Sequence, residues 1–392
     1  MKIIHTSDWH IGKFLNDYSL LDDQRYFADQ FLSHMEQLRP DAVMIAGDIY
    51  DRAVPSAESV SLLHRILNTL AGEMKIPVFL IAGNHDSGER LAFGNHLLQK
   101  SGLYIEGRLH SKTAKFTLED RYGPVNFYLL PYFDRFSVRT LFPEAEIKTD
   151  QEAFSLLCER LKSEITLEER NVLMMHGFFG CFKSSSHPVS DAAEENLPLS
   201  GASAGGSELM DLSLLPPFDY IALGHIHGAQ KAGADYARYS GSPLKYSIDE
   251  ARQEKQYELI ELTEKGKLTV TPQFITPLHD VKVLSGTFSE ISSKEFSKAL
   301  NREDYFYFHL LDQQPVLDVA ARLKSSYPNL LGVQFTQYQT GLKQNVALSH
   351  RIKQDSPQKL FEEFFLQAAG KPLTGVQSQL VTEILQEMEE IK

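Results

Sequence analysis

Five short apolar stretches of this sequence each lead into side chains that can bind a metal ion. The stretches are residues 2–6, 41–46, 78–82, 172–175 and 220–223. In chain order they lead to Asp8 and His10, to Asp48, to Asn84, to His176, and to His225 and His227. Short apolar runs of this length are typical of buried strands, and α/β sheets place their sites at the carboxyl ends of strands. The sequence therefore predicts that these side chains meet at one edge of a fold.

The order of these motifs is more informative than any one of them. A single histidine after a strand is more often a hydrogen-bonded structural residue than a ligand. Here Asp-x-His, Gly-Asp-x-x-Asp, Gly-Asn-His-Asp, a single His and Gly-His-x-His follow one another along the chain. Acids, an amide and imidazoles in this order predict a two-metal phosphoesterase site.

Helical patterns separate the first strands. Apolar residues at helical spacing predict helices over residues 22–38 and 58–70, and the strand-helix-strand order that results is typical of an α/β domain. Residues 91–98 form another apolar helical stretch, which we interpret as part of the core. Alternating apolar residues in 256–262 and 268–270 predict a β-hairpin that closes the domain.

Longer matches around the motifs indicate a family. They are Ser-Asp-Trp-His-Ile-Gly at residues 7–12, Gly-Asp-Ile-Tyr-Asp at 47–51, Gly-Asn-His-Asp-Ser at 83–87 and Tyr-Ser-Gly-Ser-Pro-Leu at 239–244. In these residues the chain resembles the calcineurin-like metallophosphoesterases and, among them, the SbcD-like nucleases of double-strand-break repair. The resemblance implies an α/β fold, a metallophosphoesterase β-sandwich flanked by helices, over residues 1–277.

The resemblance also implies roles for the site residues. One metal ion would be bound by Asp8, His10, Asp48 and His227, and the other by Asp48, Asn84, His176 and His225, so that Asp48 bridges the two. Carboxylate, amide and imidazole ligands without thiolate suit Mn²⁺, Fe or Zn²⁺, and the resemblance favours two Mn²⁺ ions. His85 would protonate the leaving oxygen or hydrogen-bond the phosphate, and the alternative is a purely structural histidine.

Charged residues beside the motifs have further expected roles. We expect Asp51 and Asp86 to orient ligating imidazoles, because such rings usually donate their second nitrogen to a carboxylate or carbonyl. Lys13, Arg52 and Arg90 lie in loops beside the motifs and could contact DNA phosphates, although exposed basic residues near a loop are more often only solvated.

The last third of the chain predicts two further parts and a linker. Residues 278–339 alternate between strand and helix patterns, and the SbcD resemblance makes this small α/β region a capping domain over the active site. Residues 340–355 are polar and aperiodic, as in a linker. Residues 356–392 predict two amphipathic helices, the second begun by a capping box of Thr374 and Gln377. This helical tail is either two packing helices or, by the resemblance, the part that binds an SbcC-type, SMC-like ATPase.

Composition limits the cellular setting. The 392 residues carry 39 basic and 52 acidic side chains, which give a net charge of -13. A negative net charge does not attract DNA electrostatically. Bound cations, local basic residues or a partner would have to supply the attraction. Two cysteines predict no disulfide framework, and the absence of a long apolar run argues against a membrane span, so we expect a cytoplasmic protein.

The sequence is compatible with two functions, and its intact motifs nearly exclude a third. The first is a nuclease subunit of an SbcCD-type complex, which acts as a double-strand exonuclease and a single-strand or hairpin endonuclease and dimerises through residues 62–67 and 91–98. The second is a phosphatase or phosphodiesterase on nucleotides or proteins, which would leave the last third without a role. The third, an inactive scaffold, conflicts with a competent side chain at every ligand position. The long polar loop 183–209 either borders the site or is a tolerated insertion.

Overall fold

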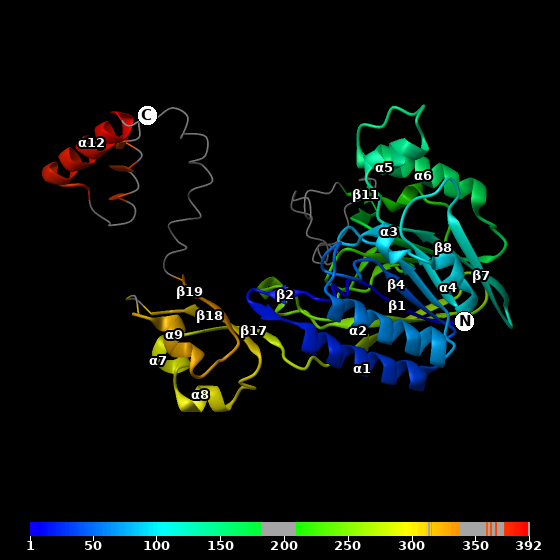
Figure 1. The fold of residues 1–392 in the computed structure, drawn as a ribbon, viewed down its shortest axis with the longest axis horizontal. Coiled ribbons are helices and arrows are strands. Elements are labelled where there is room, and N and C mark those ends of the chain that lie inside the picture. Colours follow the sequence, from blue (N-terminus) through cyan, green and yellow to red (C-terminus); the bar gives the residue numbers. More distant parts are fainter. Residues whose placement is uncertain are drawn as a thin grey trace, which may run out of the picture. The chain divides into compact units, whose positions relative to one another are not determined.

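The structure is a computed structural model that describes residues 1–181, 209–312, 314, 316–336, 358–359, 361–362, 365–366 and 372–390. The chain divides into two compact units, Met1–Val281 and Lys282–Lys392 (Figure 1). The predicted linker 340–355 lies outside the described residues, as does the predicted loop 183–209 apart from Leu209.

Two six-stranded sheets form the framework of the first unit. The first sheet has the order β16 (Leu268–Phe274), β15 (Gln256–Leu262), β1 (Lys2–Thr6), β4 (Ala42–Ala46), β5 (Val78–Ile81) and β6 (Leu103–Glu106). The second has the order β13 (Gln230–Ala234), β14 (Ala237–Tyr239), β12 (Tyr220–Gly224), β9 (Arg170–His176), β8 (Gly123–Leu130) and β7 (Ala114–Asp120). β1, β4, β5 and β6 run parallel, as do β8, β9 and β12.

The two sheets pack face to face, which confirms the predicted sandwich. Alternate residues of each strand point to the same face, and one buried cluster joins Met44 and Phe79 of the first sheet to Phe127 and Met174 of the second. The rings of Phe79 and Phe127 stack with their centroids 4.2 Å apart. This shared core fixes the ends of β4 and β5 opposite the ends of β9 and β12.

Helices cover the two outer sides of the sandwich (Figure 1). α1 (Leu21–Leu38) and α2 (Ala57–Leu67) lie along the first sheet, where the Phe31 ring meets the Tyr257 ring of β15 at 5.2 Å. α2 continues as a π-helix over Asn68–Glu73. α6 (Asp150–Glu164) packs Phe154 and Leu157 into the core of the second sheet, beside α5 (Arg135–Leu141). The helices predicted at 22–38 and 58–70 are thus confirmed.

The expectation that residues 91–98 belong to the core is wrong. The segment forms two short helices, α3 (Gly88–Leu91) and α4 (Asn95–Leu98), because Gly94 lies in the left-handed region with φ 72° and interrupts them. Neither helix has a buried residue, and the side chains of Phe93 and Leu97 are 85% and 76% exposed. The smaller pairs β2 (Phe14–Leu15) with β3 (Tyr18–Ser19) and β10 (Phe179–Gly180) with β11 (Met210–Asp211) complete the unit.

The second unit contains the predicted small α/β region. β17 (Val281–Gly286), β18 (Tyr305–Leu310) and β19 (Leu330–Phe335) form a three-stranded sheet. α7 (Phe288–Ile291), α8 (Lys294–Lys298) and α9 (Val319–Lys324) connect the strands, and Phe306, Phe308 and Leu323 centre a separate core.

The C-terminal helix α12 spans Gly375–Glu390, where the sequence predicts it. Gln377 Oε1 accepts from the Thr374 main-chain N–H at 2.9 Å, which is one half of the expected capping box. Nothing among the helices of the described residues has both the length and the apolar character that a bilayer span needs.

Candidate metal centre

Five strand ends deliver the seven predicted ligand side chains to one place. Asp8 and His10 follow β1, Asp48 follows β4 and Asn84 follows β5 in the first sheet. In the second sheet His176 ends β9 directly opposite Gly224 of β12, and His225 comes next. Asn84 of the first sheet contacts both His176 and His225 of the second, so the parallel strands of both sheets end on the same side of the sandwich. The structure therefore brings together all seven residues that the motifs predict.

The backbone at this edge is held in an uncommon conformation. Eight non-glycine residues in the described part of the chain have a positive φ, and four of them are Asp8 (53°), His10 (43°), Asp48 (48°) and His225 (106°). Such conformations persist only where the surroundings enforce them, and they concentrate at functional sites. Gly47, with φ 91°, allows the backbone to lie against the His176 ring, because a Cβ there would overlap that ring.

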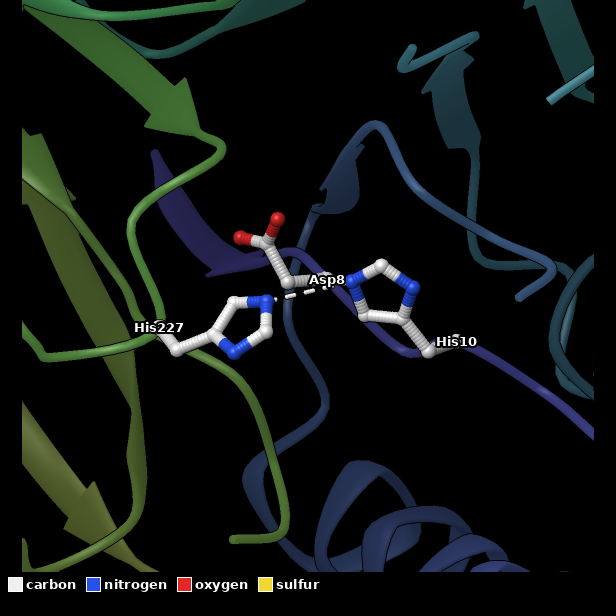
Figure 2. A group of neighbouring side chains, drawn as sticks. All are labelled: Asp8, His10 and His227. Atoms are coloured by element: carbon white, nitrogen blue, oxygen red, sulfur yellow. Dashed lines mark hydrogen bonds between the residues drawn. The ribbon is translucent and has the colours of Figure 1, made fainter. Parts of the chain in front are cut away.

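The first group of donor atoms consists of Asp8, His10 and His227 (Figure 2). One carboxylate oxygen and one ring nitrogen from each histidine lie within 4.8 Å of one another. The Nε2 atoms of His10 and His227 are 3.2 Å apart, and Asp48 Oδ2 is 3.5 Å from Nε2 of His10. These atoms match the set predicted for the first metal ion.

The second group gathers around Asn84. Its Oδ1 atom lies 3.1 Å from Nε2 of His176 and 3.0 Å from Nδ1 of His225. Asp48 Oδ2 lies 3.4 Å from the same Nε2 atom of His176. Asp48 therefore stands between the two groups, within reach of a ring nitrogen on each side.

The donor atoms of both groups fit divalent cations. They are oxygens and imidazole nitrogens without sulfur, a set that suits Mn²⁺, Fe or Zn²⁺. His176 Nδ1 lies 2.8 Å from the main-chain oxygen of Ala46, so that nitrogen donates, and in the neutral ring Nε2 would carry the lone pair that an ion takes. Asp8, His10, Asp48 and His176 are buried, and Nε2 of His10 is the nitrogen that faces His227 and Asp48. Several lone pairs that converge from buried side chains call for a positive charge.

Burial and close charges perturb the ionisation of these groups. Burial raises the pKa of Asp8 and lowers that of His10. Burial alone would raise the pKa of Asp48, but the adjacent His176 holds it below its ordinary value. Burial would lower the pKa of His176, but the adjacent Asp48 carboxylate raises it to about 9. Burial lowers the pKa of His225 to about 4. Strong, opposed shifts within one cluster are typical of functional sites.

Asp86 does not have its predicted role. Its carboxylate accepts from the main-chain N–H groups of Ile49, Tyr50 and Gly83 at 2.9–3.0 Å, and so ties the loop after β4 to the loop after β5. Burial raises the pKa of Asp86 to about 6 against these hydrogen bonds. Among the described residues its hydrogen-bond partners are these three amides, so the carboxylate positions the backbone and not an imidazole.

Asp51 lies close to a candidate ligand but is shared with a lysine. Its Oδ1 atom is 3.8 Å from Nδ1 of His10, beyond hydrogen-bond length, and 2.7 Å from Nζ of Lys13. The main-chain oxygen of Asp51 is 3.0 Å from Nδ1 of His85. Asp51 thus helps to place His85 through its backbone and Lys13 through its side chain.

His85 is exposed at the edge of the cluster. Its main-chain N–H donates to Asp48 Oδ1 at 2.9 Å, and its ring centroid lies 4.8 Å from that of His10. The side chain therefore faces solvent next to the donor groups, where a substrate could meet it.

Comparisons with known proteins agree with this geometry. The family model described as calcineurin-like phosphoesterase matches residues 1–229, and the one described as type 5 capsule protein repressor C-terminal domain, SbcD_C, matches residues 277–368. The SbcD subunit of the nuclease SbcCD from Staphylococcus epidermidis is 33% identical over 98% of both chains. That of Staphylococcus saprophyticus is 31% identical over the same share.

The chain belongs to the SbcD family. Membership of the SbcD family and of the calcineurin-like phosphoesterases makes it a metal-dependent phosphodiester hydrolase. Among solved structures, a dimetal phosphatase from Danio rerio and a protein from Thermus thermophilus match with TM-scores of 0.40 and 0.38 at 12% and 15% identity. They cover 71% and 69% of this chain and 98% of their own.

The three basic residues singled out for DNA differ in their surroundings in this SbcD-family chain. Lys13 is paired with Asp51 and three-quarters buried. Arg52 is 76% exposed and 3.7 Å from the same carboxylate. Arg90 lies exposed on α3. Arg52 and Arg90 are therefore accessible, whereas the charge of Lys13 is already compensated.

Several residues that support the SbcD-family site were not predicted from the sequence. Glu250 Oε1 lies 2.9 Å from Nδ1 of His227, and Lys255 Nζ lies 2.6 Å from Glu250 Oε2. Burial would raise the pKa of Glu250, but the hydrogen bond from His227 and the Lys255 charge lower it to about 2. Ser7 hydrogen-bonds both Asp8 and Ser240. From the sequence, only the Ser-Gly-Ser motif at 240–242 indicates this region.

Proposed function

We propose that the chain is the nuclease subunit of an SbcCD-type complex and hydrolyses DNA phosphodiesters with two Mn²⁺ ions. The observation that carries the proposal is the position of Asp48, whose Oδ2 atom lies 3.5 Å from His10 and 3.4 Å from His176. Each of these histidines belongs to a separate group of donor atoms. A carboxylate between two such groups is what a two-metal phosphoesterase requires.

The candidate ligands belong to two metal sites that share Asp48. Asp8, His10, Asp48 and His227 would bind one ion, and Asp48, Asn84, His176 and His225 the other. When bound, the two ions supply positive charge on both sides of the phosphorus. Asp86 holds the Asp48 and Asn84 loops in register through backbone amides.

His85 is the residue we propose to act on the substrate. A main-chain oxygen only accepts hydrogen bonds, so Nδ1 of His85 donates to Asp51 and Nε2 is left for the substrate. In its imidazolium form, the Nε2–H group can protonate the leaving oxygen or hydrogen-bond the phosphate. The exposed position of the ring is compatible with either role.

We further propose the partners and setting of an SbcD-type nuclease. Both SbcD relatives are named as subunits of SbcCD, and we assign an SbcC-type ATPase to the tail, where Phe361, Val376 and Leu380 are 42%, 81% and 55% exposed. These exposed apolar side chains are available for burial against a partner. The exposed Phe93 and Leu97 support a homodimer within a heterotetramer, and two free cysteines fit the cytoplasm.

We also propose that residues 278–339 form a capping domain over the active site. The proposed activities are those of a double-strand exonuclease and of an endonuclease on single-stranded and hairpin DNA. The net charge of -13 makes broad electrostatic attraction of DNA unfavourable, so Arg52, Arg90 and the partner ATPase would supply the phosphate contacts.

One assay tests the function. The purified chain with Mn²⁺, with and without its ATPase, is given linear duplex DNA, hairpin DNA and a small aryl phosphodiester. We expect cleavage of all three, with duplex degradation stimulated by the ATPase and ATP. Cleavage of the aryl ester and of nucleotides, with intact DNA in every condition, would instead make the chain a phosphatase or small-molecule phosphodiesterase.

A further inference from the structure

The imidazole of His227 is held on both of its nitrogens. Nε2 faces Nε2 of His10 within the first donor group (Figure 2). Nδ1 lies 2.9 Å from Oε1 of Glu250, which is buried in the short 3₁₀ turn Ile248–Glu250. The ring therefore connects the candidate metal centre to a carboxylate that no motif predicts.

Glu250 is surrounded by donors. Its Oε2 atom accepts from Nζ of Lys255 at 2.6 Å and from the main-chain N–H of Tyr246 at 3.2 Å. The hydroxyl of Ser247 is 3.4 Å from Oε1. A carboxylate among an ammonium, an amide and a hydroxyl acts as an acceptor, so the remaining contact, to His227, has the proton on Nδ1.

Lys255 joins this carboxylate to the backbone of the same histidine. Its side chain is only 6% exposed, and Nζ contacts the main-chain oxygen of His227 at 3.0 Å, Ser242 Oγ at 2.8 Å and Gln253 Oε1 at 2.8 Å. A buried ammonium with this set of acceptors keeps one arrangement, because each alternative would leave a buried charge unpaired.

The Ser-Gly-Ser motif at residues 240–242 also contacts the backbone of His227. The main-chain N–H of Ser242 donates to the same His227 oxygen at 3.0 Å. Gly241 has φ 78°, and a Cβ there would meet that oxygen and the Ala229 nitrogen at 2.8 Å. The backbone at 241–242 can lie this close to residues 227–229 only with glycine at position 241.

We propose that Glu250 and Lys255 are positioning residues that fix His227 as the Nδ1–H tautomer, with Nε2 presented to the metal bound by Asp8 and His10. This rests on the two-metal function proposed above. Neither residue is expected to touch substrate. Partners of this kind that hold a ligating histidine typically change metal affinity about 10- to 100-fold when replaced.

A measurement of the His227 tautomer without metal distinguishes the proposed positioning role from a purely structural one. Selective ¹⁵N labelling of histidine and two-bond ¹⁵N–¹H spectra report the tautomer of each ring, and the His227 signals are identified by their loss in His227→Gln. In wild type we expect His227 as the Nδ1–H tautomer. Glu250→Ala should give a mixture of tautomers or a change to Nε2–H, whereas Glu250→Gln, whose amide oxygen can still accept, should retain Nδ1–H.

Mn²⁺ titration provides the second measurement. Glu250→Ala should weaken one of the two Mn²⁺ sites about 10- to 100-fold and leave the other within about twofold, with Glu250→Gln in between. Lys255→Met keeps the stem of the side chain and should also weaken one site. Asp120→Asn is the matched control, because it breaks a carboxylate–Arg170 pair at the start of β9, about 20 Å along the strand from His176. It should alter stability alone.

The outcomes distinguish the positioning role from the proposed function. If Glu250→Ala retains the wild-type tautomer and both Mn²⁺ affinities, the positioning role is wrong. Should the alanine variant not fold, wild-type Mn²⁺ affinities at both sites in Glu250→Gln and in Lys255→Met would show the same. If wild type itself binds no Mn²⁺, the proposed function fails, and the tautomer comparison still decides the role of Glu250.

Discussion

The Nδ1 atom of His85 lies 3.0 Å from the main-chain oxygen of Asp51, and this contact fixes which nitrogen of His85 is free. The neighbouring residue Asn84 already points its Oδ1 atom at two histidines of the candidate centre. His85 and Asn84 therefore face different directions from adjacent positions. In the proposed function, this division would separate binding of the ions by Asn84 from action on the substrate by His85.

His85→Gln should accordingly keep the metal ions and lose turnover. General acid–base catalysis contributes about 10²–10⁴-fold, so we expect kcat on an aryl phosphodiester to fall by that factor while Mn²⁺ stoichiometry stays at the wild-type value. Calorimetric titration and steady-state kinetics on the same preparation measure both. Simultaneous loss of an ion and of activity would make His85 a ligand.

The sequence predicts the centre well because each motif is local and sits at a strand end. A strand that stops at Ala46 or Ile81 can only deliver Asp48 or Asn84 to the same edge. The supporting contacts escape such reasoning, because they join segments far apart in the chain. Glu250 reaches His227 across 23 residues, and Asp86 reaches the amides of Ile49 and Tyr50 across more than 30.

Two sequence expectations failed for local reasons. The periodicity of residues 91–98 indicates a buried face, but the left-handed Gly94 splits the helix and turns Phe93 and Leu97 outward. Asp86 has the residue type and position of an imidazole partner. Three backbone amides bind it instead, and no side-chain pattern reveals where main-chain N–H groups will point.

Leu97→Asp should convert a dimer into a monomer. Leu62 and Leu63 of α2 are buried, so Phe93 and Leu97 are the large apolar side chains that the predicted dimer surface exposes to a second copy. A charge placed in an apolar interface is costly to desolvate. Sedimentation velocity at micromolar concentration should show this change. The control is Phe136→Asp on α5, where the side chain is 59% exposed, and this variant should stay dimeric. If the wild-type chain is itself a monomer, the proposed dimer surface is wrong.

Asp120 should contribute stability that depends on pH. Burial would raise its pKa, but hydrogen bonds from Arg170 hold it below its ordinary value. A carboxylate with a depressed pKa stabilises the fold above the unfolded pKa near 4, and the contribution is lost as pH falls through the lower folded value. Asp120→Asn should lower Tm by roughly 2–4 °C at pH 7, with a smaller difference below pH 4. An equal difference at every pH would contradict this cause.

The tail should be needed for the partner and not for chemistry. A chain that ends at Lys353 should still cleave an aryl phosphodiester with Mn²⁺, but should not co-purify with the ATPase. In the full chain, Val376→Asp with Leu380→Asp should have the same effect, because both side chains are exposed on α12. Leu317→Asp, at a side chain 81% exposed, is the control. A truncated chain that forms the complex would place the interface elsewhere.

In the proposed function Asp48 belongs to two metal sites at once, and Mn²⁺ titration of Asp48→Ala tests this assignment. Wild type should bind two ions per chain. The variant should lose measurable affinity at both sites, a decrease above about 100-fold, since it removes a ligand and not only an outer partner. Asp22→Asn, at a carboxylate 80% exposed on α1, should match wild type. If Asp48→Ala still binds two Mn²⁺ ions with near-native affinity and cleaves DNA, the two-metal account is contradicted.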